Sequence, residues 1–165
     1  MSAPTRVVST VGPVLIIGSG LLGASLGLAL RAGGVRVYLE DASPTSLRLA
    51  SDVGAGVAFG DAIDEAGVAY ADAGTDAPGY EAPRIVVVAT PPDVADRVIV
   101  HSLLRFPGVI VTDVASVKDA VVADVLATLE ERGLEDAACR YVGSHPMAGR
   151  ERSGAGAADA DLFYG

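Results

Sequence analysis

A glycine-rich segment near the start of the chain has residue types and spacing that could bind a phosphate. It reads Gly18-Ser19-Gly20-Leu21-Leu22-Gly23 and follows an apolar run, residues 14–17, of the kind that forms a buried strand. In this pattern the first glycine permits a tight turn, the second lets the backbone approach a pyrophosphate, and the third lets a helix pack on the sheet. The helix start would present N–H groups and a partial positive charge to the phosphates. All six residues are therefore candidate cofactor contacts.

An acidic pair, Glu40-Asp41, follows the second predicted strand. A carboxylate at that point can accept hydrogen bonds from a ribose diol and would repel a 2′-phosphate. Asp41 is the preferred candidate because we expect the strand to end nearer to it, and no basic residue follows until Arg48. The pattern favours NAD over NADP. S-adenosylmethionine is the main competing ligand, and a structural turn without a ligand is the other alternative.

Residues 112–119 place polar side chains directly after another apolar run. Ser116 and Asp119 have the spacing of a helix cap, which would be a structural role. Lys118 falls in the first turn of the predicted helix, where a cation opposes the helix dipole. Such a cation can interact with an anionic substrate or with a carboxylate partner, and both interpretations remain open beside the structural one.

Residues 143–149 read GSHPMAG and follow the last predicted strand. Pro146 favours an extended conformation for His145, which fixes the direction of its ring. Histidine titrates near pH 7 and is a natural general base, although a lone histidine more often has a structural role. His145 is therefore a candidate catalytic residue, with the structural alternative still open.

The order of apolar and amphipathic segments predicts the fold. Predicted strands are residues 14–17, 35–39, 85–89, 109–111 and 140–143, and predicted helices are residues 20–32, 44–52, 94–104 and 116–131. Parallel neighbours need crossovers of a dozen or more residues, so this alternation predicts an α/β fold with a doubly wound, mostly parallel sheet, a Rossmann-type dinucleotide-binding domain. Ligands of such sheets bind beyond the carboxyl ends of the strands, which also selects Thr90 and Pro91.

The composition of the chain excludes several classes of protein. The 165 residues include 21 acidic side chains against 12 Lys and Arg, and the net charge of −9 argues against a nucleic-acid partner. A mean hydropathy of +0.42 with 20% charged residues excludes a disordered chain. The single cysteine, Cys139, cannot form an internal disulfide, so we expect a cytoplasmic location and a small buried side chain there. The histidines and the cysteine have no zinc-site spacing.

Three other features of the sequence do not indicate a membrane span or an additional site. The uncharged run at residues 7–30 could be a signal peptide or membrane span, but its glycines and one proline would cost a helix about 1 and 3 kcal/mol each. We therefore expect no membrane partner. Residues 61–82 contain six acids and no base, which indicates a solvated loop with one short helix. His101 lies within an amphipathic helix and is predicted to belong to the scaffold.

Taken together, the motifs resemble those of the prephenate/arogenate dehydrogenase family. The matching segments are the glycine-rich loop continued by Ala24-Ser25, then Ala89-Thr90-Pro91-Pro92, Asp113-Val114-Ala115-Ser116-Val117-Lys118 and Ser144-His145-Pro146-Met147-Ala148-Gly149. The last two are more specific than the glycine loop. The resemblance implies an NAD-dependent enzyme of tyrosine biosynthesis, which oxidatively decarboxylates prephenate or arogenate.

The resemblance also implies roles for individual residues. His145 would polarise or deprotonate the 4-hydroxyl of the substrate, and Ser116 would hydrogen-bond near the same hydroxyl. Lys118 and Glu151 match motif positions and would orient these groups. The partner implied by the resemblance is a small-molecule substrate. The alternatives to this function are a regulatory module that binds NAD without catalysis and a dehydrogenase of the hydroxyacid or imine-reducing kind.

The family further implies a helical C-terminal domain, which forms a homodimer and supplies an arginine to the substrate carboxylate. The chain stops at Gly165, where that domain is expected to begin. We therefore expect residues 1–12 to form an N-terminal extension and residues 13–165 the dinucleotide-binding domain. On this interpretation the chain is the cofactor-binding part of the enzyme.

Overall fold

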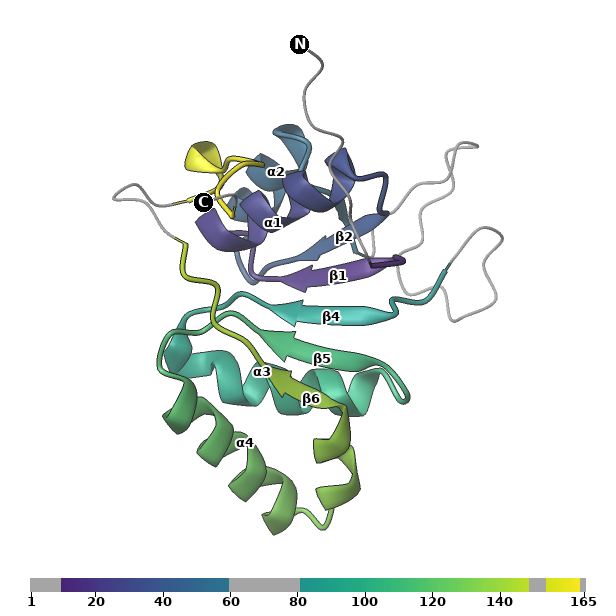
Figure 1. Cartoon of the computed structure of the whole chain (residues 1–165), viewed down its shortest axis with the longest axis vertical. Helices are drawn as coiled ribbons and strands as arrows, with labels where there is room; N and C mark the ends of the chain where they lie inside the picture. The colour runs from purple at the N-terminus through teal and green to yellow at the C-terminus, as the bar shows by residue number, and fades with distance from the viewer. Residues whose placement is uncertain (1–9, 60–80, 149–153, 164–165) are drawn as a thin grey trace.

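The computed structural model describes residues 10–59, 81–148 and 154–163 as one open sheet with helices on both faces (Figure 1). The strands are β1 (Val14–Ile17), β2 (Val37–Glu40), β3 (Val57–Ala58), β4 (Ile85–Val88), β5 (Ile110–Asp113) and β6 (Tyr141–Gly143). The helices are α1 (Leu21–Ala32), α2 (Pro44–Asp52), α3 (Pro92–Arg105) and α4 (Lys118–Glu131), with short 3-10 helices η1 (Glu135–Arg140) and η2 (Ala155–Ala157).

Neighbouring strands of the sheet are all parallel, in the order β3-β2-β1-β4-β5-β6. The chain winds outward from β1 in one direction and from β4 in the other, so the connections that follow these two central strands diverge. Ligands of doubly wound sheets bind at this switch point. The predicted α/β, parallel fold is confirmed.

The strands separate two apolar cores because alternate side chains point to opposite faces. In β1, Leu15 and Ile17 belong to the core beneath α3 and α4, whereas Val14 and Ile16 belong to the core beneath α1 and α2. Burial on both faces explains why the strands are continuous apolar runs. Each fully buried aliphatic side chain of this size contributes about 1.5–3 kcal/mol, so the cores hold the strand ends in fixed positions.

Element boundaries differ from the sequence predictions in small ways. The second strand lies at Val37–Glu40 rather than residues 35–39, and α3 begins at Pro92 rather than residue 94. Proline is compatible with the first turn of a helix, where its missing N–H has no partner to lose. Strand β3 and helix η1 were not predicted, because two residues and one 3-10 segment are too short to give a periodic pattern.

The uncharged run near the N-terminus is a strand, a turn and a helix in its described part, not one continuous span. Within residues 10–59, 81–148 and 154–163, no helix is long and apolar enough to cross a membrane. The predicted acidic loop at residues 61–82 lies outside the described residues except for its last two positions.

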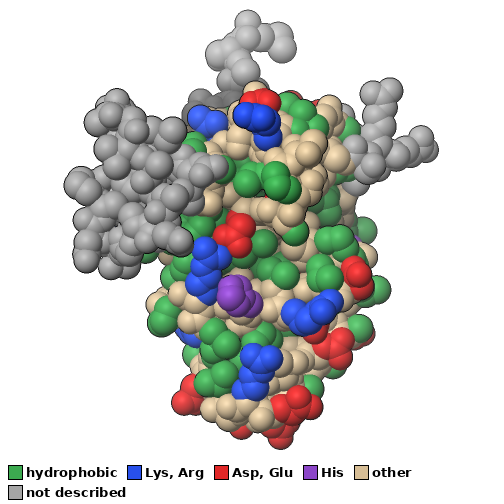
Figure 2. All heavy atoms as spheres, turned by 180° about the vertical axis from the view of Figure 1, so that it is seen from behind, with side chains coloured by type: hydrophobic (Ala, Val, Ile, Leu, Met, Phe, Trp, Pro, Cys, Tyr) green, Lys and Arg blue, Asp and Glu red, His purple; other side chains and the backbone are tan. Residues whose placement is uncertain are grey.

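The face of the molecule seen in Figure 2 carries acidic and basic side chains interspersed among hydrophobic ones. Two ion pairs on the described surface join Arg105 to Glu40 at 2.8 Å and Arg36 to Glu81 at 3.2 Å. Exposed pairs of this kind contribute about 0–1 kcal/mol, so they position side chains more than they hold the fold.

Candidate functional site

The turn between β1 and α1 is built from glycines because its backbone is packed tightly. Gly18 has a φ of +101°, and a Cβ there would lie 2.5 Å from the carbonyl oxygen of Ala89. A Cβ on Gly23 would lie 1.9 Å from the carbonyl oxygen of Gly18. A Cβ on Gly20 would meet no heavy atom within 4 Å. The first and third glycines therefore fix the turn, and the second leaves open space beside the backbone.

The start of α1 faces this open space. Gly20 is its N-cap residue, no side chain caps the helix, and the first turn contains no acidic residue. The first N–H groups of a helix have no partner within it, and the helix dipole adds a partial positive charge there. Together these features suit the oxygens of a phosphate.

Asp41 follows β2 and is already bonded to the glycine-rich turn. Its Oδ2 accepts hydrogen bonds from the backbone N–H of Ser19 at 2.6 Å and the Ser19 hydroxyl at 2.7 Å, and its Oδ1 accepts from the N–H of Ser43 at 2.8 Å. Ser19 is fully buried. A carboxylate has about four acceptor positions, so Asp41 can bind one further donor while it fixes the turn.

Glu40 is committed to a different partner. Arg105 donates to its two carboxylate oxygens at 3.0 and 2.8 Å, and the same guanidinium lies 5.1 Å from the ring centre of Phe59 and 5.0 Å from that of Phe106. Asp41 is therefore the better candidate of the acidic pair. No basic residue follows the acidic pair in the sequence until Arg48, but α3 brings Arg105 to Glu40 from 65 residues away.

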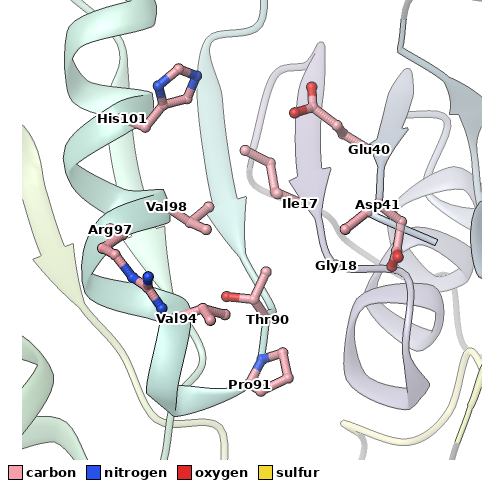
Figure 3. A pocket seen from close by; sticks show the side chains of 11 residues that line it. Ile17, Gly18, Glu40, Asp41, Thr90, Pro91, Val94, Arg97, Val98 and His101 are labelled. Atoms are coloured by element: carbon pink, nitrogen blue, oxygen red, sulfur yellow. The ribbon is translucent and has the colours of Figure 1, made fainter.

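A pocket of about 570 Å³ opens between α3 and the ends of β1 and β2 (Figure 3). Arg97, Val98 and His101 of α3 face Glu40 and Asp41 across it. The volume lies within the range of small-molecule sites. His101, predicted to belong to the scaffold, lies within α3, and its exposed side chain lines this pocket together with Val94 and Val98.

A second pocket, of about 320 Å³, lies on the other side of Thr90. Ser116, His145 and Leu22 are among the residues that line it, so the structure brings both candidate catalytic residues to one place. Thr90 lines both pockets, and its buried Oγ1 has no hydrogen-bond partner among the described residues. Buried polar atoms in folded proteins are nearly always bonded, so a ligand that passes Thr90 would satisfy this atom.

Ser116 does not cap α4, so that prediction is wrong. The helix begins at Lys118, its N-cap residue is Val117, and no side chain makes a capping hydrogen bond. The predicted helix start at residue 116 is two residues early, since residues 114–117 form a connection that turns Ser116 toward the second pocket.

Lys118 has a carboxylate partner, as one of the open interpretations predicted. Its Nζ bonds to Oδ1 of Asp113, which is fully buried at the end of β5. The same carboxylate accepts hydrogen bonds from the N–H of Ala115 at 2.8 Å and the hydroxyl of Tyr141 at 2.7 Å. Sequence reasoning gave no role to Asp113, which lies at the end of β5 much as Asp41 lies directly after β2.

Two other sequence predictions concern Cys139 and Glu151. Cys139 was expected to be buried, but it lies exposed in η1, where its Sγ contacts the carbonyl oxygen of Asp136 at 3.0 Å. Glu151 lies outside the described residues.

The different roles of Gly23 and Gly20 in the turn can be tested with two matched substitutions. We expect Gly23→Ala to lower the free energy of unfolding by about 3 kcal/mol or more, because its Cβ would collide with a backbone oxygen. Gly20→Ala should cost about 1 kcal/mol or less, the effect of a poorer N-cap, and weaken dinucleotide binding by ~10-fold, since its Cβ enters only the open space. Thermal melts and a cofactor titration measure both. Equal stabilities of the two variants would contradict this account of the turn.

A second prediction concerns the Tyr141 phenol. Its burial, its hydrogen bond to Asp113 and the charge of that carboxylate raise the pKa of Tyr141 above its ordinary value of 10.0. The stabilisation that follows is present below about pH 10 and is lost as the pH rises through the folded-state pKa. The measurement is an alkaline absorbance titration of the wild type and of Tyr141→Phe. The difference between the two curves is the ionisation of Tyr141, the component missing in the variant, and we expect it above pH 10. A missing component that titrates at or below pH 10 would refute the contact.

Comparison with known proteins assigns the chain to a family. Residues 26–165 match the model of the prephenate dehydrogenase nucleotide-binding domain. NovF of Streptomyces niveus, named a probable prephenate dehydrogenase, is 38% identical over 151 residues, which cover 92% of this chain and 35% of NovF. The prephenate dehydrogenase of Bacillus subtilis is 30% identical over 156 residues, 91% of this chain and 36% of that protein. The chain thus spans about a third of the length of these relatives.

Solved structures of related proteins are also similar to this chain. Prephenate dehydrogenase from A. aeolicus, in complex with hydroxyphenyl propionate and NAD+, is similar with a TM-score of 0.70 and 27% identity over 97% of this chain and 50% of that one. Arogenate dehydrogenase from Synechocystis gives a TM-score of 0.66 at 24% identity over 91% of this chain and 46% of its own, which bears on the fold alone. The chain with the two adjoining pockets belongs to the prephenate dehydrogenase family and corresponds to its nucleotide-binding domain.

Proposed function

We propose that this chain binds NAD as the cofactor-binding part of a dehydrogenase of tyrosine biosynthesis, which oxidatively decarboxylates prephenate or arogenate. The observation that carries the proposal is the shared wall at Thr90. One side of it is the pocket beside Asp41, and the other is the pocket lined by Ser116 and His145. A cofactor site and a proton-transfer site would thus adjoin.

The residues present fit the cofactor. The glycine-rich turn at residues 18–23 would hold the pyrophosphate against the start of α1, and Asp41 would accept a hydrogen bond from a ribose hydroxyl with its remaining acceptor position. Thr90 and Pro91 would contact the cofactor where the pockets meet. NAD, when bound, accepts the hydride that the substrate carbon releases. The A. aeolicus relative was solved with NAD+, which supports this choice.

His145 would act on the substrate hydroxyl. A neutral imidazole can accept the hydroxyl proton as the C–H bond breaks, which raises the electron density on the carbon that must lose hydride. Ser116, on the wall of the same pocket, would hydrogen-bond near that hydroxyl and hold it in position. Lys118 and Glu151 would support this arrangement from outside the reacting groups.

The proposal extends to the whole protein. The family model and the similar dehydrogenases favour catalysis over a regulatory module that only binds NAD. We propose a cytoplasmic enzyme with a small-molecule substrate, without a nucleic-acid or membrane partner, that forms a homodimer through a helical C-terminal domain. The net charge of −9 is consistent with the proposed lack of nucleic-acid binding.

The direct test is NADH formation, followed by absorbance, after NAD is mixed with prephenate or, separately, arogenate. We expect this chain to bind NAD in a titration and its full-length form to turn over one of the two substrates. A folded chain that binds no NAD would refute the cofactor assignment. NAD binding without turnover of either substrate by the full-length form would refute the reaction.

One prediction separates chemistry from cofactor binding. His145→Asn should lower kcat of the full-length form by ~10² or more, the effect of losing an acid–base group, and leave the affinity for NAD unchanged. The matched control is His101→Asn, the same substitution in the first pocket. It should leave kcat at saturating NAD unchanged. Wild-type turnover by His145→Asn would sink the mechanism.

A further prediction concerns cofactor choice. Asp41→Asn should weaken NAD binding by ~10-fold and weaken NADP binding less, because the charge that repels a 2′-phosphate is gone. Glu40→Gln is the control, since it neutralises the neighbouring carboxylate, which pairs with Arg105. We expect the control to change the preference between the two cofactors less than Asp41→Asn does. An unaltered NAD titration for Asp41→Asn would remove this residue from the site.

A further inference from the structure

Asp113 is a fully buried carboxylate that the proposed reaction does not use. It ends β5, and its two oxygens accept from three donors: the N–H of Ala115, the Nζ of Lys118 and the hydroxyl of Tyr141. A buried charge with this many partners is costly to disturb, because each donor would lose its acceptor at once.

The donors flank the two candidate catalytic residues in the sequence. Ala115 directly precedes Ser116, and Lys118 begins the helix that follows it. On the other segment, Tyr141 opens β6, whose end leads into His145. The side chain of Asp113 thus holds both segments that form the second pocket.

The backbone of Asp113 makes the same connection. Its carbonyl oxygen accepts hydrogen bonds from the N–H of Ser144 at 3.2 Å and from the Ser144 hydroxyl. Ser144 adjoins His145, so the position of the histidine backbone is tied to the end of β5 by two bonds besides the Tyr141 contact. Tyr141 and Ser144, 28 and 31 residues away and both on the segment of β6, therefore bond to this one residue.

Gly143 makes room for this arrangement. A Cβ there would lie 2.8 Å from Cδ of Lys118 and 3.5 Å from the hydroxyl oxygen of Tyr141. The aliphatic part of Lys118 therefore passes over β6 at a position without a side chain on its way to Asp113. The glycine is explained by this contact, which the cofactor proposal leaves unused.

We propose that Asp113 is a positioning residue, which sets the placement of His145 relative to Ser116 through Lys118, Tyr141 and Ser144. Buried ion pairs add little to stability compared with apolar residues of the same size, but a fully bonded polar network favours one geometry. The catalytic meaning of this placement rests on the proposed function, whereas the placement itself is a property of this chain.

The test compares Asp113→Asn with Asp124→Asn, an identical substitution at an exposed carboxylate of α4. The chain has two histidines, so NMR can follow the imidazole of His145 with His101 as an internal reference. We expect Asp113→Asn to shift and broaden the His145 signals, to leave His101 and the affinity for NAD unchanged, and to lower kcat of the full-length form by ~10². Asp124→Asn should match the wild type in all four measurements.

Two milder variants keep the proposal testable if Asp113→Asn does not fold. Gly143→Ala displaces Lys118 without removing a polar group, and Tyr141→Phe removes one donor. Each should move the His145 signals in the same direction, by less than Asp113→Asn. His145 signals that stay at their wild-type positions in folded Gly143→Ala and Tyr141→Phe would overturn the proposal, as would unchanged signals in a folded Asp113→Asn.

The outcome is separable from that of the proposed function. If the full-length form turns over neither prephenate nor arogenate, the reaction is wrong, yet the His145 spectra of this chain still show whether Asp113 positions the histidine. If turnover occurs and the spectra do not respond, the positioning role is wrong and the reaction stands.

Discussion

Close backbone packing at the middle of the sheet determines where everything else in the site can lie. The turn after β1 passes so near to Ala89, at the end of β4, that a side chain at Gly18 would overlap it, and Gly23 packs against the same turn. This contact brings the start of α1 to the switch point of the sheet. It also places Thr90, the residue after Ala89, between the two pockets. A bulkier turn would separate the helix start from Thr90, and the pockets would no longer adjoin.

Two carboxylates then fix the connections on either side of that contact. Asp41, after β2, gathers the N–H and hydroxyl of Ser19 and so holds the glycine-rich turn. Asp113, the last residue of β5, accepts hydrogen bonds from Lys118 and Tyr141 and so holds the segments around the second pocket. Parallel strands leave unpaired N–H groups in the connections beyond their carboxyl ends, and an acidic residue at the strand end is a compact acceptor for them. A carboxylate at a strand end thus holds the connections beside both pockets.

The sequence predicted local structure best where the residues that produce it lie in the same short segment. The glycine spacing and the continuous apolar strands are local, and their structures were predicted. The errors arise where tertiary contacts decide. The amphipathic pattern of α3 was correct, but nothing in it showed that His101 faces a pocket or that Arg105 reaches Glu40.

The second pocket shows the same limit at a finer scale. The local pattern around Ser116 suggested a cap, yet Asp113 takes the N–H of Ala115 and draws Lys118 to itself, and the helix starts later. Asp113 also accepts a hydrogen bond from Tyr141, a contact that the segment around Ser116 does not contain. The half around the first pocket is lined by the ends of β1 and β2 and by α3. The half around the second pocket is lined by Leu22, Ala89, Pro92, residues 114–116 and the segment around His145, so the two linings meet at Thr90. Changes confined to one half should therefore leave the other intact, which is the condition for assigning binding and chemistry to different parts of one small domain.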